Sequence, residues 1–144
     1  MSNKMIFLFL LVASCGFGQG SSVSPSTTTT PALARDEVLA RAKTVYVISQ
    51  TFYVKKEQLE SGLINNKSLA ARGIQVVESQ KEADLVLTVK RAPFQNNFPF
   101  TFIEQENGTV VMGGTVNSLF GTVPGKIAGR LADKLKEIAK RNSR

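Results

Sequence analysis

A chain of 144 residues with a formal charge of +7 has room for one domain with one hydrophobic core. It contains no histidine and a single cysteine, Cys15. The composition therefore excludes Ser-His-Asp and Cys-His catalytic groups, every zinc site that uses histidine, and any internal disulfide. We expect no cofactor and no metal.

The first 18 residues have the pattern of a secretory signal peptide. Lys4 precedes an apolar run at residues 5–12, and small residues follow it. This run is too short to span a bilayer permanently. We therefore expect residues 1–18 to direct export from a bacterial cell.

Two processing routes remain open. Residues 12–15 read Val-Ala-Ser-Cys, which resembles the lipobox of bacterial lipoproteins and makes Cys15 a candidate lipidation site. Residues 16–18, Gly-Phe-Gly, fit ordinary signal peptidase instead. In either case residues 19–31, rich in Ser, Thr and Pro, are expected to form a disordered linker to a single domain at residues 32–144.

The first half of this domain shows a helix, a strand and a crossover. Helix-forming composition predicts a lead-in helix at residues 32–43, and the β-branched segment 44–49 predicts the first core strand. Apolar residues at helical spacing predict a helix over residues 54–64. Because the next strand, residues 74–78, follows this helix, we expect it to run parallel to the first in a right-handed crossover.

The clearest alternation lies at residues 83–91. Its apolar side is expected to face the core and consists of Ala83, Leu85, Leu87 and Val89. Residues 98–105 predict a further strand, in which Phe98, Phe100 and Phe102 share the core side. Pro99 cannot donate a ladder hydrogen bond, which indicates a strand start or an edge.

A hairpin is predicted at Asn107-Gly108, leading into a strand at residues 109–118. The Gly113-Gly114 pair within that strand indicates a bulge or a close backbone approach. A final amphipathic helix is expected to bury the stripe Ile127, Leu131, Leu135 and Ile138. The sequence thus predicts an α/β (α+β) fold, a two-layer sandwich whose mixed sheet of about five strands has helices on one face, in the order β-α-β-β-β-β-α.

The positive charge is concentrated at the C-terminus. Residues 126–144 hold seven cationic and two acidic side chains. A basic helix face is either a solvated surface or a contact for an anionic neighbour. The candidate residues for contact with an anionic envelope surface are Lys134, Lys136, Lys140 and Arg141.

Other chemistry has weaker signals. Glu57 and Glu60 form one carboxylate pair and Glu104 and Glu106 another, and both are expected in exposed positions. Residues 121–126 resemble a phosphate loop between a strand and a helix, but the required glycine and the Ser or Thr after the lysine are missing. No catalytic or cofactor-binding residue is assigned.

A resemblance rests on residues 42–47, 82–87 and 127–132, with Asn107-Gly108 and Gly113-Gly114. Together they resemble a group of small uncharacterised secreted proteins from soil bacteria of the acidobacterial type. More distantly, the element order resembles α/β lipoprotein domains of bacterial envelope assembly systems, including the N-terminal domain of the Tol system's periplasmic protein. The resemblance supplies no site residues.

These observations predict a non-enzymatic protein of the bacterial cell envelope, in the periplasm or at the outer-membrane periphery, with a binding or assembly role. The expected partner is an envelope protein or an anionic envelope surface. We do not expect binding to nucleic acid. We expect contact with a membrane only through a lipid attached to Cys15. The alternative is a small hydrolase that works without histidine, through carboxylates such as Glu57 or Glu104 or through a Ser-Lys pair.

Overall fold

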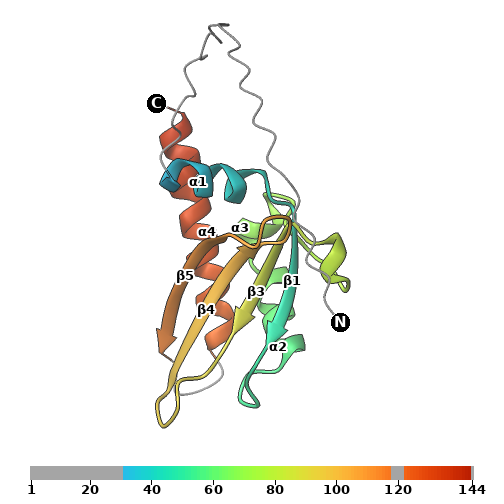
Figure 1. Cartoon of the computed structure of the whole chain (residues 1–144), viewed down its shortest axis with the longest axis vertical. Coiled ribbons are helices and arrows are strands. Elements are labelled where there is room, and N and C mark those ends of the chain that lie inside the picture. The colour runs from blue at the N-terminus through green and yellow to red at the C-terminus, as the bar shows by residue number, and fades with distance from the viewer. Residues whose placement is uncertain (1–30, 118–121, 144) are drawn as a thin grey trace, which may run out of the picture.

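The computed structural model describes residues 31–117 and 122–143. They form a five-stranded mixed sheet with helices packed against one face, the predicted two-layer sandwich (Figure 1). No helix within these residues is long and apolar enough to cross a membrane. In chain order the elements are α1 (Pro31–Arg41), β1 (Thr44–Ser49), α2 (Lys56–Ile64), α3 (Lys67–Ala70), β2 (Gln75–Val76), the 3₁₀ helix η1 (Gln80–Glu82), β3 (Leu85–Val89), β4 (Asn97–Glu104), β5 (Val110–Asn117) and α4 (Val123–Asn142).

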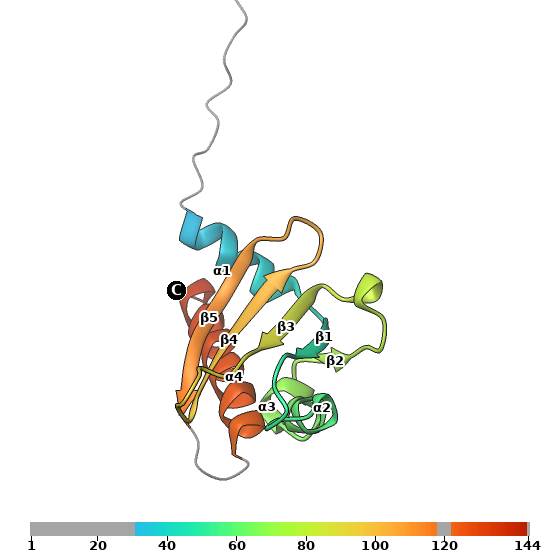
Figure 2. The same ribbon diagram turned by 60° about the horizontal axis from the view of Figure 1, so that its bottom comes forward.

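The strands lie in the order β2-β1-β3-β4-β5. β1 pairs in parallel with β2 and with β3, whereas β4 is antiparallel to both β3 and β5 (Figure 2). Parallel pairing of β1 with β2 follows from the crossover through α2 and α3. The predicted order of strands and helices is confirmed, with α1 ahead of it.

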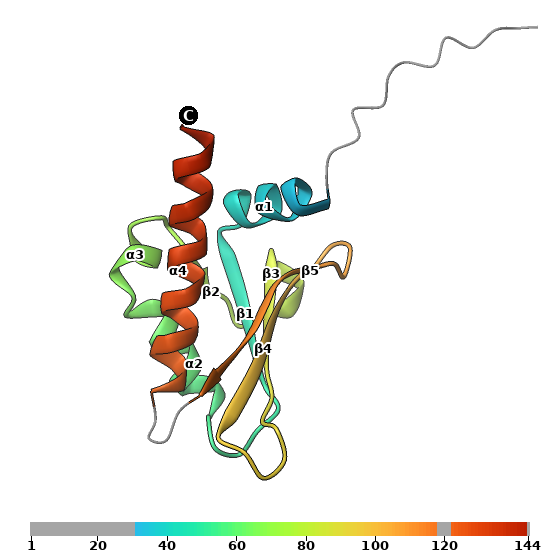
Figure 3. The ribbon, with the colours of Figure 1, turned by 90° about the vertical axis from the view of Figure 1, so that its left-hand side faces the viewer.

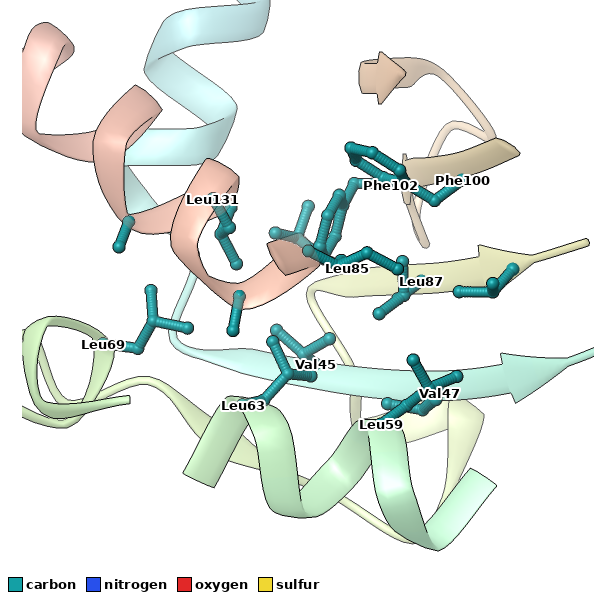
Figure 4. Close-up of a cluster of buried hydrophobic side chains, with 14 of the residues drawn as sticks. Val45, Val47, Leu59, Leu63, Leu69, Leu85, Leu87, Phe100, Phe102 and Leu131 are labelled. Carbon is teal, nitrogen blue, oxygen red and sulfur yellow. The ribbon is translucent and has the colours of Figure 1, made fainter. Parts of the chain in front are cut away.

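The core lies between the sheet and the helices α2, α3 and α4, which Figure 3 shows on one side of the strands. Leu87 is at its centre, paired with Val47 on one side and with Phe102 on the other. The rings of Phe100 and Phe102 meet edge to face at 6.1 Å, and Leu131 of α4 faces the same cluster (Figure 4). The predicted core side of each of these elements is confirmed.

β2 is shorter than the predicted strand at residues 74–78. Ile74 is still tied to the preceding helical turn, because its N–H donates to the carbonyl of Leu69 at 3.1 Å. The ladder to β1 ends when the N–H of Val77 donates to Val45 at 3.0 Å, and the chain then turns into η1. Local capping therefore limits the strand at both ends.

Of the two alternatives predicted for Pro99, the sheet edge is wrong because β4 is a central strand, and Pro99 lies near the strand start, one residue before the pairing with β3 begins at Phe100. It is the third residue of β4, which is paired on both sides. Its carbonyl accepts from the N–H of Lys90 at 2.9 Å, one residue beyond the end of β3. Because N–H and C=O of one strand residue point the same way, Pro99 cannot return a hydrogen bond to Lys90, so the β3–β4 pairing loses one bond just beyond the end of β3.

The irregularity in β5 differs in place from the prediction. The register shift lies where Phe102 and Ile103 face Met112 and Val110, ahead of the two glycines. The close approach is found at Gly114, where an added Cβ would lie 3.2 Å from the ring of Phe100.

Two further details also differ from the prediction, the backbone of the hairpin turn and the start of α4. The hairpin turn has positive φ only at Gly108, not at both of its central residues. α4 begins at Val123, with Pro124 in its first turn, so residues 123–126 are helical rather than part of a loop.

Candidate functional site

Three of the four candidate basic residues of α4, Lys134, Lys136 and Arg141, form ion pairs with acidic neighbours, whereas Lys140 is exposed. Arg141 lies 2.7 Å from the carboxylate of Asp36 in α1, and Lys134 lies 3.5 Å from it. Both also approach Glu137, at 3.4 and 3.3 Å. Since Asp36 is buried, Lys134 and Arg141 hold α1 against α4. Lys136 lies 3.9 Å from Asp133 at the exposed surface, and contact of this face with an anionic surface remains a prediction.

Changing Lys134 and Arg141 together to Gln should lower the free energy of unfolding by about 1–2 kcal/mol, because the buried carboxylate of Asp36 loses both cations. Changing the exposed Lys136 and Lys140 to Gln should stay within about 0.5 kcal/mol. Urea unfolding of the two double variants measures the difference. Equal losses would show that Asp36 does not depend on these cations.

Glu104 is buried, contrary to the expectation that it is exposed. Only 5% of it is accessible, since alternation along β4 places it on the same side as Phe102, close to α1. One carboxylate oxygen pairs with Arg41 of α1, and the other accepts from the side chain of Asn107 at 3.2 Å. This carboxylate therefore ties α1 to the β4–β5 hairpin.

A cavity of about 390 Å³ opens beside this pair and is lined by Arg41, Asp84 and Glu104 among others. Asp84 accepts hydrogen bonds from the backbone N–H groups of Lys43 and Thr44 at 2.7 and 2.9 Å. Partial burial raises the pKa of Asp84, but these hydrogen bonds and the charge of Arg41 outweigh it, so the pKa lies below its usual range. The hydrogen bonds from Lys43 and Thr44 to the ionised Asp84 therefore stabilise the start of β1 above about pH 4, and this stabilisation is lost on further acidification.

The remaining carboxylates that the sequence singled out lie at the surface. Glu60 pairs with Lys56 at 3.4 Å within α2, and Glu57 and Glu106 are exposed. Among residues 31–117 and 122–143, no group of three or more acidic or cysteine side chains is arranged to hold a metal ion. Cys15 lies outside the described residues.

The most exposed aromatic side chains lie at one end of the sheet, where β1 and β3 finish. Phe52 is 102% exposed in the β1–α2 connection, and Phe94 is 105% exposed in the β3–β4 connection. Tyr53 is 67% exposed, and the guanidinium carbon of Arg91 lies 3.5 Å from its ring centroid. We call Phe52, Tyr53, Arg91 and Phe94 the aromatic tip. Figures 1 and 3 show both connections at the end opposite α1 and the C-terminus.

Hydrogen bonds fix both ends of the loop that carries Phe52. The N–H of Gln50 donates to the carbonyl of Val89 at 2.8 Å, which extends the β1–β3 pairing by one residue. The hydroxyl of Ser49 donates to the carbonyl of Val54, whose side chain is buried. With both ends of the loop fixed, Phe52 and Tyr53 are left pointing outward.

The loop that carries Phe94 has an unusual backbone. Phe94 has a φ of 58°, a region that bulky side chains rarely adopt. The side chain of Arg91 donates to the carbonyl of Gln95 at 3.1 Å and braces this turn. The same Arg91 therefore supports both halves of the aromatic tip, one through Tyr53 and one through Gln95.

The charged side chains of the two tip loops are all cationic. The two loops, residues 50–55 and 90–96, contain Lys55, Lys90 and Arg91 and no carboxylate. Lys55 and Lys90 are exposed, and neither has an ion pair among the described residues. The tip therefore combines exposed rings with cations that are free to meet an anionic partner.

Sequence reasoning did not single out Phe52, Tyr53 or Arg91. It assigned Phe98, Phe100 and Phe102 to the core, where the structure places them, and it gave no role to Phe94. The signal for the tip was present as adjacent aromatics between a strand and a helix, outside any helical or strand periodicity.

No protein-family model matches the chain, and no curated protein matches it in sequence. Among solved structures it is similar to two crystal forms of a PelC dodecamer from Paraburkholderia phytofirmans. A point variant in one form shares 19% sequence identity over 65% of this chain and 87% of the PelC chain, with a TM-score of 0.41. The other form shares 22% sequence identity over 77% of this chain and 92% of the PelC chain, with a TM-score of 0.37. At these TM-scores the likeness adds nothing to what the residues themselves indicate.

Proposed function

We propose that this chain is a non-enzymatic protein of the bacterial cell envelope that binds another envelope component through the aromatic tip. The observation that carries the proposal is the full exposure of Phe52 and Phe94 on two loops joined by the Arg91–Tyr53 contact. Exposed aromatic rings on two neighbouring loops leave apolar surface in water, and burial of that surface against a partner is favourable. Residues 1–18 act as the export signal and residues 19–30, ahead of α1, as the tether.

Three carboxylates elsewhere in the domain form contacts that stabilise the fold. Glu104 and Asp84, the carboxylates beside the 390 Å³ cavity, are bound to Arg41 and to the start of β1. Glu60 is paired with Lys56. The contacts of Glu104 with Arg41 and Asn107 account for its burial without any catalytic role, which is why we favour binding over catalysis.

Photo-crosslinking in intact bacterial cells tests the proposal. The full chain carries benzoylphenylalanine in place of Phe94, or in place of Leu33, an exposed apolar residue of α1 at the opposite end. We expect crosslinks from position 94 to a component of the envelope fraction and few from position 33. Equal labelling at both positions, or recovery of the protein from the cytoplasm only, would contradict the proposal.

A further inference from the structure

We infer that the aromatic tip docks on an anionic lipid bilayer, with Phe52 and Phe94 in the interfacial region and Lys55, Lys90 and Arg91 on the phosphate headgroups. This inference rests on the proposed function and names the component that is bound. It concerns a contact separate from any lipid carried by Cys15.

The shape of the tip suits a bilayer surface. Phe52 and Phe94 lie on two neighbouring connections, and their near-complete exposure means that neither ring packs against the domain. Projecting rings of this kind can enter the headgroup region without any rearrangement of the fold. Tyr53, with an apolar ring and a polar hydroxyl, has the character of residues found at membrane interfaces.

The charges complement anionic headgroups. Lys55 and Lys90 lie in the same two loops as the rings, and neither loop contains a carboxylate that would repel phosphate. α2 and α4 both begin at this end of the molecule, so the positive ends of two helix dipoles add to the same potential (Figure 3). Glu57 in the first turn of α2 is the nearest opposing charge along the chain.

The α4 face is the less suitable surface for the same ligand. Lys134 and Arg141 are already paired with Asp36 and Glu137, and no large exposed apolar side chain lies on that helix. Electrostatic attraction without apolar insertion gives weaker binding at physiological salt. The combination of rings and unpaired cations is found at the aromatic tip.

Vesicle co-sedimentation tests the inference. The experiment uses residues 19–144 of the protein. This part contains the whole described core and omits the apolar run at residues 5–12. The probe is unilamellar vesicles of phosphatidylcholine, with or without phosphatidylglycerol. We expect binding to the vesicles that contain phosphatidylglycerol, and weaker binding as salt rises from about 0.05 to 0.5 M.

Three double variants separate the causes. Phe52→Ser with Phe94→Ser should reduce vesicle affinity by about tenfold or more, since two rings no longer leave water. Lys55→Gln with Lys90→Gln should reduce it by about fivefold for each charge removed. The matched control, Leu33→Ser with Val110→Ser, removes exposed apolar side chains at the other end and should bind like the wild type.

The outcomes distinguish this inference from the proposed function. Binding that survives the phenylalanine changes, or no binding by the wild type, overturns the lipid assignment. If crosslinks from position 94 then lead to a protein or a glycan, the proposed function stands with a different component. If neither crosslinks nor vesicle binding occur, both are wrong.

Discussion

Replacing Leu87 with alanine is expected to lower the free energy of unfolding by about 2–5 kcal/mol. Leu87 is fully buried in the central strand β3, between Val47 and Phe102 of the neighbouring strands. Truncation removes apolar contacts on both sides and leaves a cavity that the sheet cannot close without shifting its ladders. Equilibrium unfolding in urea, monitored by circular dichroism, measures the loss.

Lys90→Ala is the matched control for this change. Lys90 lies three residues further along the chain, just beyond the end of β3, and its side chain is exposed. Its replacement should change the free energy of unfolding by no more than about 0.5 kcal/mol. Losses of similar size at positions 87 and 90 would mean that the two sides of β3 are assigned incorrectly.

Gly62→Ala is expected to destabilise the protein by about 1–3 kcal/mol through overpacking. Gly62 lies in α2 where this helix meets the first turn of α4. A Cβ at position 62 would stand 2.6 Å from the Cβ of Pro124 and 2.9 Å from its carbonyl carbon. The backbone of α4 would have to move, which outweighs the better helix propensity of alanine.

Gly129→Ala tests the same chemistry without the clash. Gly129 also lies within a helix, but a Cβ there would meet no atom within 4 Å. Alanine should therefore stabilise the protein by about 0.5–1 kcal/mol through helix propensity. Thermal unfolding of both variants should show shifts of opposite sign, and a loss at both positions would contradict the packing described at Gly62.

The fold was largely predictable because its core obeys simple periodicity. The alternation in β4 and the stripe from Ile127 to Ile138 each identify the side that is buried, whereas in β3 Val86 on the side opposite the core is buried as well. Boundaries were less predictable, since the ends of β2 depend on a hydrogen bond from Ile74 to a preceding helical turn. The hydrophobic pattern of the sequence carries no information about such backbone hydrogen bonds.

Charged positions required tertiary information. The burial of Glu104 depends on Arg41, 63 residues away, which the sequence pattern cannot pair with it. Likewise, Asp36 of α1 engages Lys134 and Arg141, so a face that looks freely basic in sequence is partly neutralised. The aromatic tip was missed because its two loops are distant in sequence and adjacent only through the sheet.

Spin labelling tests most directly whether the aromatic tip is the surface that meets the envelope. The chain from Gln19 onward has no cysteine, so a nitroxide can be attached at Gln95→Cys beside the tip or at Ala139→Cys beside Lys140 on α4, with the rings of Phe52 and Phe94 intact. On addition of native envelope membranes, the electron paramagnetic resonance spectrum should broaden for the label at position 95 and stay unchanged at position 139. Broadening at position 139 alone would contradict the assignment and return the binding surface to the basic face of α4.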